Sequence, residues 1–479
     1  MLFNSYPFLL VFFPVVFAGY FLLRRFRQDW GAKFFLVLAS LYFYGYFKPS
    51  YLVILIGSLV LNYLMCRVMQ QNDSGAVRKL MLTLGCLLNI SILGYFKYTG
   101  FLLENLNLFF GCSFPAFSIL LPLGISFYTF QQLSYLIDTY HGSNRGIGFV
   151  DYALFVTFFP QLIAGPIVLP GEMLPQFNDP AKQQLSWANM NDGLFLFACG
   201  LIKKCFLADT LAIIADTGFN TGTPLTFAEG WFVSLAFSFQ LYFDFSGYCD
   251  MAMGIGKFFN IDLPLNFNSP YKSTDFQSFW RRWHITLGRF MMNYLYIPLG
   301  GNKHGMTRTL LNLLTVFLVS GIWHGAGWLF LIWGGLHGAG ILLNRIWQKA
   351  VLKKHPSWEI PKIPAILITF FFVNLFWVFF RATTVKRAWE IICSMMDFSN
   401  LEYLSKPFRR ALEDHGFDQD LLFIVCGVAV ALAFFSPNSM EMSRKLQQHP
   451  RWRMGLTIVF FVIGFLCVGR ISPFLYFNF

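Results

Sequence analysis

A single histidine stands inside one of the most apolar stretches of the sequence. His324 lies between Trp323 and Gly325 within FLVSGIWHGAGWLFLIWGGLHGAG, residues 317–340. A histidine in a membrane is costly, so it usually faces the protein interior or an aqueous cavity, where it can act as a base or carry a proton. The alternative is a structural histidine satisfied by a backbone carbonyl at a helix interface. The many glycines nearby permit close helix packing and are compatible with both interpretations.

Residues 275–308 mix cationic and aromatic side chains. The sequence reads DFQSFWRRWHITLGRFMMNYLYIPLGGNKHGMTR and includes Arg281, Arg282, Trp283, His284 and Arg289. Arginine binds phosphate through paired hydrogen bonds, and aromatic rings accept a base or a thioester arm, so this group suits the mouth of a site for a phosphorylated donor. The same mixture is typical of a helix anchored at lipid headgroups. Composition alone leaves both interpretations open.

The remaining histidines and the cysteines give little support to other site chemistries. The eight histidines contain no HExxH motif and no pair at i,i+4 spacing, so no metal site is predicted. The nine cysteines contain no CxxC pair and lie mostly in apolar stretches, which indicates buried thiols rather than a disulfide scaffold. A lone membrane histidine near a cationic mouth favours base-assisted transfer of a group to a hydroxyl.

Other polar residues in apolar segments are predicted to be structural. His337 follows His324 by 13 residues, about 220° further around a continuous helix, so the two would not share a face. Hydrogen bonding between helices is the favoured role for Gln131, Gln132, Gln240, Asp244 and Asp250. Asp244 is the first of these to test for function.

The elements that must position these residues are membrane helices. Of the 479 residues, 56% are hydrophobic and only 13% are charged, whereas a soluble domain carries about 25% charged residues. Near-spanning apolar runs predict about eleven membrane helices. They cover residues 5–23, 34–47, 51–66, 80–96, 148–169, 193–214, 228–249, 309–344, 363–380, 420–435 and 454–471. Residues 117–140 and 275–300 are interrupted by Pro, Gly and charge, which is typical of re-entrant or interfacial helices.

The predicted fold class is therefore an all-α polytopic membrane protein. One membrane domain is expected over residues 1–470, followed by a C-terminal tail at 471–479. The formal net charge is +12, but the basic residues form short clusters between apolar runs, which favours orientation in an anionic membrane and predicts no nucleic-acid partner. Basic loops at 24–33, 67–79, 345–362 and 436–453 are predicted to be cytoplasmic, which places both termini outside the cytoplasm.

Six sequence words are spread over most of the chain. They are LLPLGISFYTFQQLSYLIDTY at 120–140, FFPQLIAGPIV at 158–168, QLYFDFSGYCDMAMG at 240–254, FWRRWHITL at 279–287, YLYIPLGGN at 294–302 and SGIWHGAGW at 320–328. In these words the chain resembles the membrane-bound O-acyltransferase (MBOAT) family, and within it the bacterial alginate O-acetyltransferase branch. It is also similar to peptidoglycan O-acetyltransferases and to the membrane proteins of teichoic acid D-alanylation. The ending SPFLYFNF at 472–479 resembles the C-terminal ending of this branch.

The resemblance implies an MBOAT fold with helices around a central tunnel in the bacterial cytoplasmic (inner) membrane. It implies that an acyl group is taken from a cytoplasmic thioester and delivered across the membrane to a cell-surface polymer. By position, His324 matches the family's catalytic histidine and His284 its second histidine, on the cytoplasmic side. Tyr476 matches a terminal tyrosine that carries the acyl group to an extracytoplasmic transferase; the alternative for Tyr476 is an aromatic residue at the membrane interface.

Two positions depart from the family pattern. The family often has an Arg-Asp pair where this chain has Met292 and Asn293, and it often has an arginine after LIAGP, where this chain reads IVLP. Neither change removes a catalytic group. Either could alter how the donor or a partner is held.

The sequence thus predicts a membrane O-acetyltransferase acting on an exported, alginate-like polysaccharide. Acetyl-CoA is the expected donor, bound from the cytoplasm by Arg281, Arg282 and Arg289 beside Trp283, and no tightly bound cofactor is expected. His324 would be the general base toward a hydroxyl such as that of Tyr476. A periplasmic SGNH-like acetyltransferase partner is expected, because no serine catalyst is found in the chain. Peptidoglycan and cellulose are alternative acceptors, and a transporter of the acyl donor that does no chemistry is the alternative from another class.

Overall fold

The described part of the protein is helical. A computed structural model describes residues 1–115, 119–414, 419–469 and 474–475, and these residues contain no β-strand. They pack as two compact units, each assembled from separate stretches of sequence. The first contains Met1–Gly200, Tyr248–Leu265 and Arg451–Phe461, and the second contains Leu201–Gly247, Asn266–Pro450 and Val462–Phe479.

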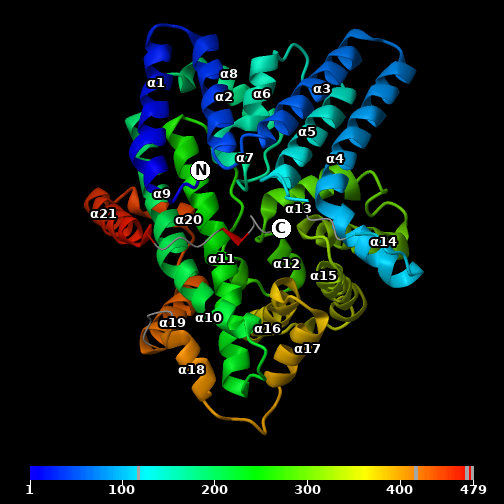
Figure 1. Cartoon of the computed structure of the whole chain (residues 1–479), viewed down its shortest axis with the longest axis vertical. Coiled ribbons are helices and arrows are strands. Elements are labelled where there is room, and N and C mark those ends of the chain that lie inside the picture. Colours follow the sequence, from blue (N-terminus) through cyan, green and yellow to red (C-terminus); the bar gives the residue numbers. More distant parts are fainter. Residues whose placement is uncertain (116–118, 415–418, 470–473, 476–479) are drawn as a thin grey trace. The chain divides into compact units, whose positions relative to one another are not determined.

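The helices follow one another closely along the chain (Figure 1). Up to residue 202 the α-helices are α1 (Phe13–Arg25), α2 (Asp29–Gly45), α3 (Tyr51–Gln71), α4 (Gly75–Phe110), α5 (Ile125–Tyr140), α6 (Phe149–Thr157), α7 (Phe159–Leu162), α8 (Pro170–Asn178) and α9 (Trp187–Ile202). The later ones are α10 (Asp209–Asn220), α11 (Phe227–Phe258), α12 (Phe276–Trp280), α13 (Ile285–Met291), α14 (Gly305–His324), α15 (Trp328–Ile346), α16 (Lys362–Arg381), α17 (Val385–Ser394), α18 (Lys406–Glu413), α19 (Gln419–Phe435), α20 (Ser439–Leu446) and α21 (Pro450–Cys467). Short π or 3₁₀ turns are η1 (Phe8–Phe12), η2 (Pro180–Lys182), η3 (Lys203–Ala208), η4 (Pro270–Lys272), η5 (Met292–Tyr296), η6 (Trp347–Leu352) and η7 (Pro356–Trp358).

Seven helical segments of the described chain are long and apolar enough to cross a membrane. They are Phe8–Arg25, Tyr51–Gln71, Gly75–Phe110, Gly305–His324, Trp328–Leu352, Lys362–Arg381 and Pro450–Cys467. The number is eight when Asp420–Phe435 and Ser439–Leu446, bent by 71° at their junction, are counted as one broken span. The multi-pass helical architecture is confirmed, whereas the predicted count of eleven spans is not.

Two of the predicted spans are interrupted in the structure. The predicted span 148–169 is divided at Phe158 into α6 and α7, and the second half of α6, residues 152–157, is buried. The predicted span 193–214 is likewise divided among α9, η3 and α10. A protein core needs apolar side chains as much as a lipid contact does, so hydropathy alone counts buried helices as spans.

In the first unit, α3, α4 and α5 pack against one another (Figure 1). Buried amide side chains join these helices. Asn89 of α4 donates to the Oδ1 of Asn62 on α3 at 2.7 Å. Asn62 in turn donates to the Oε1 of Gln132 on α5, and Gln132 donates to the Oγ of Ser58 at 3.1 Å. The predicted hydrogen bonding of Gln132 between helices is therefore confirmed.

In the second unit, α14 and α15 pack against each other (Figure 1), and their backbones come into close contact. A Cβ atom added to Gly334 of α15 would lie 2.5 Å from the carbonyl oxygen of Phe317, and one added to Gly321 of α14 would lie 2.4 Å from that of Phe330. Only glycine permits this approach at both positions. His324 follows Gly321 by about one turn, so the glycine contact also fixes the distance of His324 from α15.

Replacing Gly334 with alanine is expected to force the two helices apart. The Gly334→Ala variant should lose about 1–3 kcal/mol of stability because its methyl group would overlap a backbone oxygen that cannot rotate away. The thermal unfolding midpoint of the purified protein in detergent measures the loss. Gly335→Ala is the matched control, because its Cβ would meet only Leu318 Cδ2 at 3.9 Å. Equal midpoints for the two variants would contradict the proposed backbone contact.

Candidate active site

His324 is the last residue of α14 and only 2% of it is exposed. Its Nδ1 lies 2.7 Å from the carbonyl oxygen of Ser320, one turn earlier in the same helix. A carbonyl oxygen can only accept a hydrogen bond, so Nδ1 carries the proton and Nε2 is the nitrogen with the lone pair. The backbone carbonyl expected for a structural histidine is thus present, and it sets the tautomer that a general base requires.

Aromatic rings surround the imidazole of His324. The ring centroids of Trp323 and Trp333 each lie 4.9 Å from that of His324, and the centroid of Phe380 lies 5.6 Å away. These rings come from α14, α15 and α16. The imidazole of His324 is therefore enclosed by aromatic side chains from three helices.

His284 lies near His324, with ring centroids 6.2 Å apart. It occupies the turn between α12 and α13 with a left-handed φ of 46°, which is uncommon for a residue other than glycine. Its Nδ1 is 3.2 Å from Asn266 Oδ1, which also accepts hydrogen bonds from the backbone N–H and the hydroxyl of Thr286. Because that oxygen is an acceptor for both Thr286 groups, Nδ1 of His284 donates to it. The structure therefore brings the two predicted histidines together, each with its Nδ1 bound to an acceptor.

The electrostatic environment of His284 also favours a neutral ring. His284 lies outside the candidate membrane spans and is 1% exposed. Burial, and secondly the neighbouring imidazole of His324, lower the pKa of His284 well below its ordinary value. Two adjacent neutral imidazoles can exchange a proton with a hydroxyl without creating a lasting buried charge.

The predicted donor-binding residues occupy different environments. Arg281 is exposed, and Arg282 and Arg289 are half-buried. The Nη1 of Arg282 reaches the carbonyl oxygen of Asn268 at 3.5 Å. Trp283 is 1% exposed and packs in the aromatic core, with Trp377 at a centroid distance of 4.9 Å. Trp283 therefore supports the turn that carries His284, and the role of the arginines toward a donor stays a prediction.

A buried ion cluster forms around Lys204 in the second unit. Lys204 of η3 pairs with Asp209 of α10 at 2.7 Å and with Asp244 of α11 at 2.8 Å. The second oxygen of Asp244 accepts the backbone N–H of Leu475 at 2.9 Å. The sequence pointed to Asp244 but not to its partners. Lys204 could have been recognised as a partner from its position in the apolar run 193–214, because an unpaired charge there would be very costly.

The C-terminal residues are described only at 474–475. The predicted carrier Tyr476 lies outside the described residues. Phe474 is 1% exposed, and its ring centroid is 5.9 Å from that of Phe245. Phe245 in turn has its ring centroid 4.9 Å from that of His284. The described end of the chain is therefore part of the packing around the two histidines.

His337 belongs to the aromatic core of the second unit and is fully buried. Its Nδ1 accepts a hydrogen bond from Trp280 Nε1 at 3.3 Å, and its ring is stacked on Phe279 with centroids 6.1 Å apart. Across the described residues, no group of three or more His, Cys, Asp or Glu side chains is arranged to hold a metal ion.

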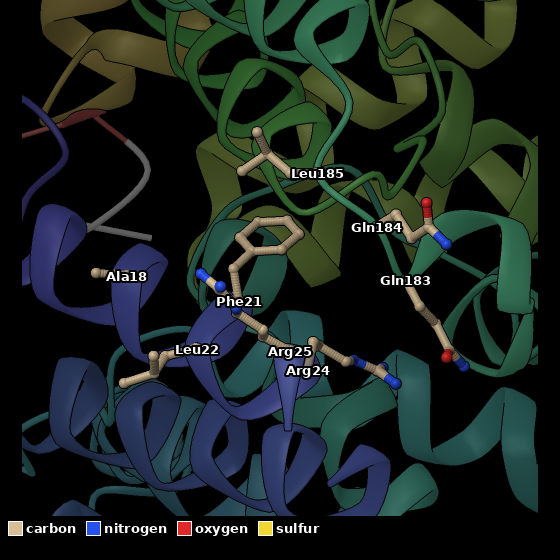
Figure 2. A pocket seen from close by; sticks show the side chains of 8 residues that line it. All are labelled: Ala18, Phe21, Leu22, Arg24, Arg25, Gln183, Gln184 and Leu185. Carbon is tan, nitrogen blue, oxygen red and sulfur yellow. The ribbon is translucent and has the colours of Figure 1, made fainter. Parts of the chain in front are cut away.

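The first unit contains a separate cavity of about 460 Å³ (Figure 2). Its lining residues are Ala18, Phe21, Leu22, Arg24, Arg25, Gln183, Gln184 and Leu185. Arg24 donates to Asp29 at 2.8 Å and to the hydroxyl of Tyr20 at 3.2 Å, so its guanidinium already has an anionic partner. The cavity combines apolar walls with a polar side, and it includes none of the predicted donor-binding arginines.

Comparison with known proteins agrees with the multi-pass helical architecture. Residues 143–385 match the family model of membrane-bound O-acyltransferases. The chain is 44% identical to the peptidoglycan O-acetyltransferase of Helicobacter pylori, in an alignment covering 100% of this chain and 98% of that protein. It is 38% identical to a Pseudomonas aeruginosa protein named as a probable alginate O-acetylase, over 83% of this chain and 75% of the relative. It is 28% identical to the teichoic acid D-alanyltransferase of Streptococcus thermophilus, over 55% of this chain and 69% of the relative. A family match over half of the chain and a full-length relative at this identity lead to one conclusion: the chain belongs to the membrane-bound O-acyltransferase family.

Proposed function

We propose that this protein is an O-acetyltransferase that supplies acetyl groups for peptidoglycan. The observation that carries the choice of polymer is the 44% identity to a peptidoglycan O-acetyltransferase over the full length of this chain. The alginate-related protein is 38% identical over 83% of the chain. The acceptor favoured from sequence alone, an alginate-like polysaccharide, therefore becomes the second candidate. Membership of an acyltransferase family also argues against a transporter that performs no chemistry.

His324 is the proposed general base of the transfer. Its Nε2 takes the proton of an acceptor hydroxyl while the hydroxyl oxygen attacks the carbonyl carbon of an acetyl thioester. The tetrahedral intermediate then breaks its carbon–sulfur bond, and the leaving thiolate takes up the proton from the imidazolium. The hydrogen bond from Nδ1 to the Ser320 carbonyl, 2.7 Å long, supports this role because it holds the ring in the required tautomer and orientation.

His284 is the proposed second histidine of the site. Its imidazole is close enough to His324 to stabilise the imidazolium formed during transfer, and Asn266 fixes its orientation. The proposed donor is acetyl-CoA, whose phosphates would be bound from the cytoplasm by Arg281, Arg282 and Arg289. The exposure of Arg281 and the partial exposure of the other two support this assignment.

The acetyl group is also proposed to be delivered to the outer side of the membrane. Tyr476 is the proposed acceptor of the acetyl group from the donor, forming a phenyl ester. An SGNH-like partner in the periplasm would then move the acetyl group from Tyr476 to the polymer. The cytoplasmic membrane is the proposed location, with both termini on its outer side.

The role of His324 is tested by His324→Ala. This change removes the base and should lower O-acetylation of peptidoglycan by about 100-fold or more, with normal protein abundance in the membrane. The measurement is the acetate released by mild alkali from purified peptidoglycan, and the exported polysaccharides of the same cells are assayed in parallel. His355→Ala is the matched control, because His355 is exposed and stacks only on Trp358 among the described rings. Retained acetylation in His324→Ala would exclude the base assignment, and esters lost only from another polysaccharide would reassign the acceptor.

The role of Tyr476 is tested by Tyr476→Phe, which deletes one hydroxyl and keeps the aromatic ring. We expect ester formation on the polymer to fall to background, because phenylalanine has no hydroxyl that could accept the acetyl group. Mass spectrometry of the C-terminal peptide should detect the acetyl group on the unmodified sequence and none in the variant. Tyr403→Phe, at an exposed position, provides the comparison for loss of a tyrosine hydroxyl. Unchanged polymer acetylation in Tyr476→Phe would rule out carriage by this residue.

A further inference from the structure

The last described residues of the chain are held in the second unit by one backbone hydrogen bond and one ring contact. The N–H of Leu475 donates to Asp244 Oδ2 at 2.9 Å. Phe474 is buried and packs against Phe245, which follows Asp244 on α11. Two successive residues of α11 thus contact two successive residues near the C-terminus.

The acceptor of this hydrogen bond is a buried carboxylate. Asp244 is 1% exposed and Lys204 is 3% exposed. The Oδ1 of Asp244 pairs with Lys204 Nζ at 2.8 Å, which leaves Oδ2 directed to Leu475. A hydrogen bond from a backbone N–H to a carboxylate is about twice as strong as one between neutral groups, and low dielectric strengthens it further.

Lys204 contacts a second carboxylate as well. Its Nζ also pairs with Asp209 at 2.7 Å. One ammonium group therefore faces two buried carboxylates, and a further hydrogen-bond donor helps to satisfy Asp244. The backbone of Leu475 is such a donor, so the cluster is matched to the chain end that it contacts. A buried ion pair alone seldom stabilises a fold more than apolar residues would, which favours a specific positioning role for this cluster.

The same contacts lead from the chain end to the histidines. The ring of Phe245 lies between Phe474, at 5.9 Å, and His284, at 4.9 Å. His284 is 6.2 Å from His324, centroid to centroid. Fixing Leu475 on Asp244 therefore fixes the start of the terminal residues beside the site of the proposed transfer.

We propose that Asp244, held by Lys204, anchors the C-terminal segment through the Leu475 N–H and thereby positions the chain end for acetyl transfer at His324. Asp244 and Lys204 are positioning residues, since neither contacts the reacting atoms. The anchor itself depends only on described contacts. Its contribution to transfer rests on the proposed function, in which the acetyl acceptor is the residue that follows Leu475.

The anchor is tested first without any enzyme assay. A Leu475→Cys reporter keeps the backbone N–H, and the rate at which a water-soluble maleimide alkylates its new thiol is measured by peptide mass spectrometry. Adding Asp244→Ala should raise this rate about 10-fold or more, because a hydrogen bond to a buried charged acceptor is lost. Adding Asp244→Asn should raise the rate as well, because a carboxamide has a single acceptor oxygen, for which Lys204 Nζ competes, and its NH2 group cannot accept from the Leu475 N–H. The exposed native Cys393 is the internal reference and should react equally in all variants.

The contribution to transfer is tested by Leu475→Pro. Proline has no N–H, so this variant removes the donor and leaves the pairs of Lys204 with Asp209 and Asp244 intact. We expect acetylation of the C-terminal peptide from labelled acetyl-CoA to fall about 10-fold or more, with an unchanged thermal midpoint. Leu475→Ala keeps the N–H and is the matched variant for both the thermal midpoint and the label.

The outcomes separate the anchor from the proposed function. Equal alkylation of the reporter thiol with and without Asp244→Ala would overturn the anchor, whatever the activity. Faster alkylation with Asp244→Ala but undiminished acetylation in Leu475→Pro would overturn its positioning role. If the unmodified protein acquires no acetyl label at all, the proposed function fails, and the alkylation rates still decide whether the anchor exists.

Discussion

A polar group inside this protein has to find its partner within the chain, because neither lipid nor an apolar core can replace water. The buried amides of α3, α4 and α5 satisfy one another, and Lys204 is matched by two carboxylates. The same constraint acts on His324, whose Nδ1 is bound to the backbone of its own helix. That bond fixes the tautomer in which Nδ1 carries the proton. In the proposed mechanism the other nitrogen, Nε2, acts as the base.

The geometry around His324 depends in turn on two glycines, which have no side chain. Gly321 and Gly334 let α14 and α15 approach until backbone atoms touch, and this brings Trp333 to 4.9 Å from the imidazole. A wider spacing would leave a gap beside the ring. Packing between two helices therefore sets the shape of the site around His324.

The sequence was most informative where a polar residue type interrupts a long apolar run. His324 was a candidate because an imidazole is exceptional in an apolar run, and His284 was a candidate because it matches the second histidine of the family that the sequence resembles. The membrane architecture followed from composition, but hydropathy does not show where a helix is interrupted, so the divided α6–α7 and α9–α10 segments were each counted as one span. The hydrogen bond between Asp244 and Leu475 joins positions 231 residues apart. Such contacts depend on tertiary folding, and no local pattern in one sequence records them.

The left-handed backbone of His284 has a consequence for how its substitutions are interpreted. At a φ of 46°, a side chain with a Cβ is strained unless it can compensate locally, as asparagine does. An alanine there would remove the imidazole and also bias the turn between α12 and α13 toward another conformation. The loss of function in such a variant would combine chemistry with geometry. Asparagine, which tolerates this region of backbone space, is the replacement that isolates the imidazole. The difference between the alanine variant and a glycine variant, both of which lack the imidazole, reports the backbone contribution, because glycine is unstrained there.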